Sequence, residues 1–141
     1  LGQLVFYDSK KKEELECILH PRVFKLEKHD YNRICNIDPK ALVIVDAALI
    51  IESGNYKEMD KLIVINADEK TRINRVLSQS KWNHNEVVSR FKNQMPSEEK
   101  IKYADFVLDN SMDKTYLKDQ VKILNTKLSL LAKKNIKKSV T

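Results

Sequence analysis

Asp46 is the first residue in this sequence whose type and place could do chemistry, because it directly follows the apolar run Leu42–Val45. Phosphate-transferring proteins often hold magnesium with an aspartate at the end of a buried strand. An aspartate in this place can equally be a turn residue that accepts hydrogen bonds from the backbone. The position alone favours neither interpretation.

Arginines form a second candidate site. Arg72, Arg75 and Gln79 are spaced i, i+3, i+7, so they share one face of a helix, and Arg90 follows on the next expected helix. The guanidinium group binds phosphate oxygens in a fork, and a pair of helices that carries arginines could therefore cover a bound phosphate. Spacing alone favours the simpler alternative, a solvated basic helix.

Alternating strands and helices must position these side chains. Continuous apolar runs predict strands at 42–45, 62–65 and 106–108, of the kind that a parallel sheet buries on both faces. Expected helices begin near Ser9, Asp68, Asn83, Ser97 and Ser111. His20-Pro21 is expected to interrupt the first helix, because proline disfavours helical geometry in the residue before it. The pattern indicates an α/β layered fold.

Composition limits the possible classes of function. Apolar residues make up 42% and charged residues 33% of the 141 residues, which predicts a globular chain. No apolar run approaches the roughly 20 residues that cross a bilayer, and Cys17 and Cys35 lack the spacing of a metal or redox site. We therefore expect a reduced, cytoplasmic protein without a membrane partner. The net charge of +6 favours polyanions in general.

Three motifs resemble dephospho-coenzyme A kinases. They are Leu19-His20-Pro21, the segment Asp46 to Glu52, and the stretch from Gln94-Met95-Pro96 to Asp109-Asn110, in the order and spacing of that family. The resemblance implies a three-layer P-loop nucleoside-kinase-like fold with a parallel sheet, of which 1–141 is a single partial domain. Residues 9–36 would form a helical substrate-binding region and residues 68–95 a lid.

The resemblance also implies an activity: ATP, with Mg²⁺, would phosphorylate the ribose 3′-hydroxyl of dephospho-coenzyme A. Arg75 would be the lid arginine that stabilises phosphate, although Gln79 stands where the family often has a second arginine. The implied substrate contacts are His20, Tyr56 and Arg90, the implied magnesium ligand is Asp46, and the implied ATP contacts near adenine are Asp109 and Asn110. His20 can instead be a buried residue at a helix end, and Asp109-Asn110 can simply turn the chain.

A phosphate-binding loop needs glycines followed by Lys and Ser or Thr, and neither Gly2 nor Gly54 supplies one. The resemblance places that loop and the general-base aspartate before Leu1. We therefore expect that the first two strands are absent, that the chain alone is inactive, and that it self-associates or borrows the missing strand from another polypeptide.

Three alternatives remain at this point. The chain could belong to another small nucleoside or nucleotide kinase, it could be a basic nucleic-acid-binding protein, or it could be a non-catalytic regulatory remnant. Nucleic-acid binding is disfavoured because the lysines are scattered and no aromatic residues are interleaved with them.

Overall fold

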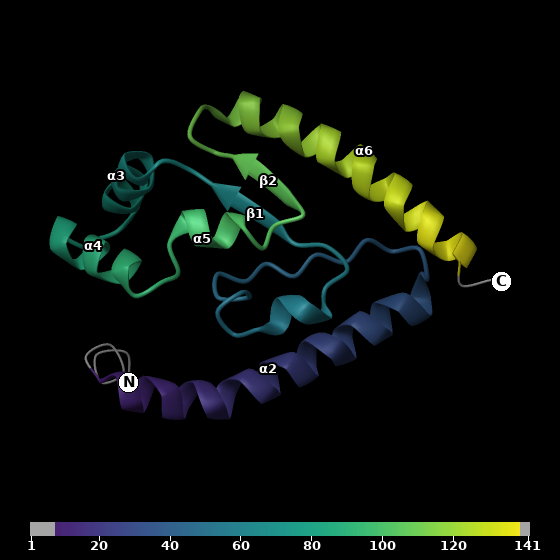
Figure 1. Ribbon diagram of the computed structural model, residues 1–141, viewed down its shortest axis with the longest axis horizontal. Helices are drawn as coiled ribbons and strands as arrows, with labels where there is room; N and C mark the ends of the chain where they lie inside the picture. The colour runs from purple at the N-terminus through teal and green to yellow at the C-terminus, as the bar shows by residue number, and fades with distance from the viewer. Residues whose placement is uncertain (1–7, 139–141) are drawn as a thin grey trace. The chain divides into compact units, whose positions relative to one another are not determined.

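The computed structural model describes residues 8–138. The backbone divides into two compact units, Leu1–Ala47 and Ala48–Thr141, which are treated separately below. The α-helices are α2 (Ser9–Ile37), α3 (Glu69–Gln79), α4 (His84–Lys92), α5 (Ser97–Ile101) and α6 (Lys114–Lys138), the strands are β1 (Ile63–Asn66) and β2 (Phe106–Asp109), and η1 (Asn55–Glu58) is a short 3₁₀ helix (Figure 1). No helix within 8–138 is long and apolar enough to cross a membrane.

The first unit contains one long helix, so the predicted interruption at His20-Pro21 is wrong. Helix α2 runs through Pro21, and the Asp8 carboxylate caps its start by accepting a hydrogen bond from the Lys11 amide. Proline removes one amide from the helical ladder. Close to this point the Arg22 side chain donates to the Ile18 carbonyl at 2.5 Å. The carbonyl that the missing Pro21 amide would have bonded is that of Cys17, so the Arg22 bond does not replace the lost hydrogen bond. The many other hydrogen bonds of this 29-residue helix carry it through the proline.

The strand predicted at 42–45 is also wrong, since the segment that follows α2 has no regular secondary structure. Leu42 is 48% exposed and Ile44 is 71% exposed. A strand exists only through hydrogen bonds to a neighbouring strand. The described residues give this apolar segment no strand partner, so the pattern alone could not make it a strand.

The second unit contains a parallel pair of strands. In the register, Ile63 of β1 lies opposite Phe106 of β2, and Asn66 lies opposite Asp109. Both strands begin or end within a residue of their expected positions. The predicted α/β class with a parallel sheet is confirmed.

Helices pack on both faces of this strand pair (Figure 1). On one face, Leu108 contacts Leu124 and Leu128 of α6. On the other face, Val64 clusters with Ile51 and Leu62, with α5 packed against them. The two apolar clusters fix the strands, and the strand ends are thereby held in one place.

The helix starts predicted near Ser9, Asp68, Asn83 and Ser97 are confirmed. Asp68 caps α3 through the Thr71 amide, and Asn83 caps α4 in a reciprocal pair with Glu86. The start of α6 is a correction: the Asp113 carboxylate, not Ser111, caps α6 by accepting from the Tyr116 amide at 2.8 Å. Ser111 is unable to cap α6 because it lies in the turn that follows β2.

Candidate functional site

The carboxyl ends of β1 and β2 lie side by side and carry polar residues. Asp68 follows β1 after one intervening residue, whereas β2 ends in Asp109 and continues into Asn110. The Asn110 amide donates to the Asn66 carbonyl at 2.6 Å, which joins the two strand ends. Ligands of parallel α/β sheets bind at this edge.

The two carboxylates at this edge hold backbone turns. Asp68 accepts from the Thr71 amide at 2.8 Å, and hydrogen bonds from Thr71 hold the pKa of Asp68 below its ordinary value. Asp109 accepts from the Ser111 amide at 2.9 Å, and Ser111 likewise lowers the pKa of Asp109. The Ser111 hydroxyl in turn accepts from the Asp68 amide at 3.0 Å. Both acids are therefore charged at neutral pH and fix the shape of the site.

Arg75 reaches this edge from α3. Its guanidinium donates to the Asn110 carbonyl at 2.6 Å and to the Met112 carbonyl at 3.2 Å. The structure thus brings Arg75, Asp109 and Asn110 together, three residues that the sequence places in two separate motifs.

Gln120 is part of this arrangement, and sequence reasoning missed it. Its side-chain carbonyl accepts from the Asp109 amide at 2.9 Å, and its side-chain amide donates to the Asp109 carbonyl at 2.8 Å. No motif marks this residue, because a glutamine inside a helix ordinarily indicates a solvated position. We name the segment 109–112 and its contacts with Arg75 and Gln120 the β2 turn.

Two stacked arginines hold α4, one against α3 and one against the segment that connects the two helices. The Arg72 guanidinium lies 5.1 Å from the centre of the Phe91 ring, and the Arg90 guanidinium lies 3.7 Å from the centre of the Trp82 ring. The Arg72 Nε is buried, and among the described residues it has no hydrogen-bond partner. The Arg72–Phe91 contact joins α3 to α4, whereas the Arg90–Trp82 contact packs α4 on the short segment that connects the two helices. The resulting helical hairpin is the segment predicted to be a lid.

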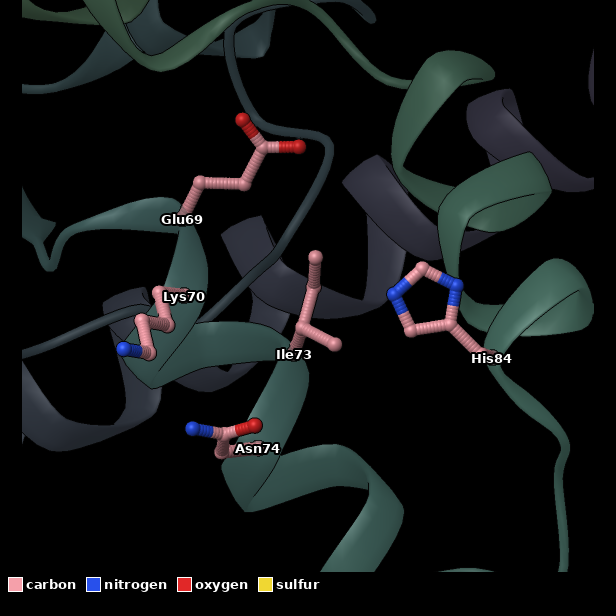
Figure 2. Close-up of a pocket in the computed structure, with 5 residues that line it drawn as sticks. All are labelled: Glu69, Lys70, Ile73, Asn74 and His84. Atoms are coloured by element: carbon pink, nitrogen blue, oxygen red, sulfur yellow. The ribbon is translucent and has the colours of Figure 1, made fainter.

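A shallow pocket of about 410 Å³ lies on the same hairpin and is lined by Glu69, Lys70, Ile73, Asn74 and His84. Figure 2 shows the imidazole of His84, at the start of α4, pointing toward Ile73 of α3. None of the site residues predicted from the sequence lines this pocket.

Tyr56 lies elsewhere in the second unit. Its ring contacts Tyr103 edge to face, with centroids 5.3 Å apart, and packs against the cluster of Ile51, Leu62 and Val64. Nearby, the Lys100 ammonium lies 2.9 Å from the Glu52 carboxylate.

His20 and Asp46 belong to the first unit. His20 is half-buried and stacks on Phe24 at 5.7 Å between ring centroids, whereas Asp46 is exposed. Among residues 8–138, no group of three or more His, Cys, Asp or Glu side chains could hold a metal ion.

One protein family and several known proteins match the sequence of this chain. A family model described as dephospho-CoA kinase matches residues 1–115. A dephospho-CoA kinase of Aquifex aeolicus is 39% identical over 119 residues, which are 82% of this chain and 58% of that protein. One of Syntrophus aciditrophicus is 30% identical over 128 residues, 91% of this chain and 54% of that protein.

A solved structure extends the comparison to the fold. The crystal structure of TT1252 from Thermus thermophilus matches with a TM-score of 0.71 and 28% identity, and the match covers 90% of this chain and 64% of that one. This chain spans less than two thirds of the length of these relatives. The match over residues 1–115, together with these relatives, shows that the chain belongs to the dephospho-CoA kinase family.

Proposed function

We propose that the complete protein uses ATP to phosphorylate the ribose 3′-hydroxyl of dephospho-coenzyme A in the cytoplasm. The observation that carries this proposal is the match of the family model over residues 1–115. The nucleic-acid-binding alternative is not favoured, since the same match spans most of the chain.

The β2 turn supports a nucleotide site. Phosphoryl transfer depends mostly on positioning and on neutralising phosphate charge. In this proposal Asn110 reads the adenine, and Asp109 holds the turn that presents it. Arg75 stabilises the phosphates, because its bonds to the Asn110 and Met112 carbonyls leave further N–H donors on the guanidinium.

The helical hairpin would act as the lid over the phosphates. Arg90 is held against Trp82 at 3.7 Å, so its charge has a fixed place on α4. A rigid pair of helices that carries arginines can cover or uncover a bound nucleotide as one body.

Magnesium is the metal implied for the reaction, and Asp46 would hold it. Mg²⁺ keeps several waters and binds proteins through one or two carboxylates together with substrate phosphates. A single exposed carboxylate such as Asp46 fits that manner of binding, whereas a multi-residue metal cage is not found among residues 8–138. When bound, the ion would neutralise charge on the phosphates.

Two further residues would contact dephospho-coenzyme A. His20 and its stacked neighbour Phe24 give α2 an aromatic surface, on which a nucleotide base can stack. Tyr56 keeps part of its side chain accessible while its ring packs on Tyr103. In this proposal both residues bind the acceptor substrate, and residues 9–36 form much of its site.

The test is an assay of the complete reading frame that contains these residues. ADP release and the phosphorylated product are measured with dephospho-coenzyme A and ATP. Arg75→Ala should lower kcat on the order of a hundredfold, because a phosphate-directed donor is lost. Arg75→Lys should recover only part of the rate, since lysine lacks the fork.

Asn74→Ala is the matched control, because Asn74 is the exposed neighbour of Arg75 on the same helix. It should leave turnover unchanged. A folded wild-type protein without 3′-phosphorylation would refute the proposed activity, and an Arg75→Ala variant with normal turnover would refute the role of this arginine.

A further inference from the structure

The β2 turn is held at its outer edge by a side chain that imitates a strand. The Asn110 amide points toward β1, where it bonds to Asn66. Because neighbouring residues of a strand direct their backbone groups to opposite sides, the N–H and C=O of Asp109 point away from β1. Gln120 binds both groups, at 2.9 and 2.8 Å.

The turn is held from its other side as well. Arg75 binds the Asn110 and Met112 carbonyls, and the Ser111 amide bonds to the Asp109 carboxylate. Within the described residues, the side-chain amide of Asn110 makes no hydrogen bond. These contacts therefore engage backbone groups of the turn, and the side-chain amide of Asn110 is left to bind a ligand.

We propose that Gln120 is a positioning residue for base recognition by Asn110, an inference that rests on the proposed ATP-binding function. An asparagine amide pairs with the amino group and N7 of adenine through one acceptor and one donor. Guanine carries a carbonyl oxygen in place of that amino group. In the same amide orientation, the side-chain oxygen of Asn110 would face this carbonyl oxygen, and two acceptors cannot form a hydrogen bond. Discrimination then depends on the orientation of Asn110.

Gln120 supports that discrimination in two ways. By binding both backbone groups of Asp109, it fixes the strand end from which Asn110 projects. It also covers the backbone N–H and C=O of Asp109. These groups could otherwise pair with a base and weaken the preference for adenine. Both effects act on the base and not on dephospho-coenzyme A.

The experiment compares Gln120→Ala with wild type in the complete protein. Equilibrium binding of ATP and GTP is measured by calorimetry. The KM is measured for ATP and for dephospho-coenzyme A. We expect ATP to bind about fivefold more weakly, the size of effect that the loss of about one net hydrogen bond gives. The ratio of ATP to GTP affinity should narrow, and the KM for dephospho-coenzyme A should stay the same.

Three further variants make the result specific. Asp119→Ala, an exposed neighbour that pairs with Lys122, should change neither nucleotide affinity. Gln120→Glu keeps the acceptor for the Asp109 amide but loses the donor, so it should fall between alanine and wild type. In an Asn110→Ala background, Gln120→Ala should have little further effect on ATP binding, because the part of its effect that strengthens ATP binding, the fixing of the strand end, acts through Asn110.

The outcomes separate this inference from the proposed function. If Asn110→Ala weakens ATP binding while a folded Gln120→Ala variant keeps the wild-type ATP to GTP ratio, Gln120 only caps the strand edge and the positioning role is wrong. If Asn110→Ala also leaves the ratio of ATP to GTP affinity unchanged, Asn110 does not read the base. The roles assigned to Asn110 and to Gln120 are then both wrong. If ATP binds but no product forms, the proposed activity fails, and the binding ratios still decide the role of Gln120.

Discussion

Glu52 illustrates how one side chain joins distant parts of the second unit. Its carboxylate lies 2.9 Å from the Lys100 ammonium and accepts from the Met95 amide at 3.1 Å. Lys100 also donates to the Ala48 carbonyl at 3.1 Å. The Glu52 and Lys100 side chains are 23% and 17% exposed, so solvent screens this pair less than a surface pair. The pair therefore ties the turn before β1 to α5.

The pKa of Glu52 predicts a pH-dependent stability. Partial burial raises this pKa, but the hydrogen bonds with Lys100 and the Met95 amide lower it by more, so it lies below the ordinary value of 4.5. A carboxyl whose pKa is lower in the folded state stabilises the fold above the unfolded pKa. That stability is lost as the pH falls below 4.5 through the folded pKa.

Glu52→Gln should therefore lower the free energy of unfolding by about 1–2 kcal/mol at neutral pH, the worth of a charge-assisted hydrogen bond. The difference from wild type should shrink on acidification, since the wild-type carboxyl then becomes neutral too. Urea denaturation of the complete protein at neutral pH and at a series of pH values decreasing from 4.5 measures this, with exposed Glu58→Gln as the control. A difference that stays constant with pH would show that Glu52 acts through packing and not through charge.

At the level of single residues, the sequence predicted part of the site. Asp109 and Asn110 were placed at a strand end, because an apolar run that closes with polar residues indicates one. The contact of Arg75 with Asn110 spans 35 positions and depends on how α3 folds back on the strand pair. Gln120 could not be found, since its partners are backbone groups, which carry no sequence signal.

Helix α4 shows an element whose start the sequence determines locally. The Asn83 side chain accepts from the Glu86 amide at 3.0 Å, and the Glu86 carboxylate accepts from the Asn83 amide at 2.8 Å. With only nine residues, α4 is too short to be stable by itself in water. Its stability depends on this capping box and on the stacking of Arg90 and Phe91 with residues outside the helix.

Asn83→Ala should destabilise α4 by about 1 kcal/mol, the usual cost of losing an N-cap side chain. Amide hydrogen exchange across 84–92 should accelerate several-fold, while exchange in β1 and β2 should not change. Ser89→Ala, at an exposed position of the same helix, is the control. Equal acceleration in the strands would mean that the hairpin and the sheet unfold as one unit.

The elements that were predicted wrongly share a physical reason. Caps are local, so Asp68 and Asn83 were found from the sequence. The run 42–45 has the composition of a strand, but a strand needs a partner that the described residues do not provide. Pro21 was expected to end a helix, yet the loss of one hydrogen bond is small beside the others along a helix of 29 residues. In both cases, residues outside the short stretch of sequence around the motif determined the secondary structure.

At the scale of the molecule, the two-stranded sheet matters most, because in the described part of the chain one edge of it is open to other chains. A sheet of two strands is marginal in water unless helices or further strands cover it. Here α5 and α6 cover the faces, but within 8–138 the outer edge of β1 has no strand partner. Ile65 on β1 is 61% exposed. An exposed apolar strand edge is a template for pairing with another chain.

We therefore expect the 141-residue chain alone to self-associate through β1. Sedimentation velocity over a range of concentrations should show a growing fraction of larger species, and Ile65→Lys should suppress it, because a lysine on an edge strand opposes pairing. Ile123→Lys is the matched control, since Ile123 is 59% exposed but belongs to helix α6 and not to a strand. If both variants suppress association equally, general surface hydrophobicity is the cause. If the wild-type chain is monomeric and unfolds cooperatively at every concentration, the open edge of β1 is not a site of pairing.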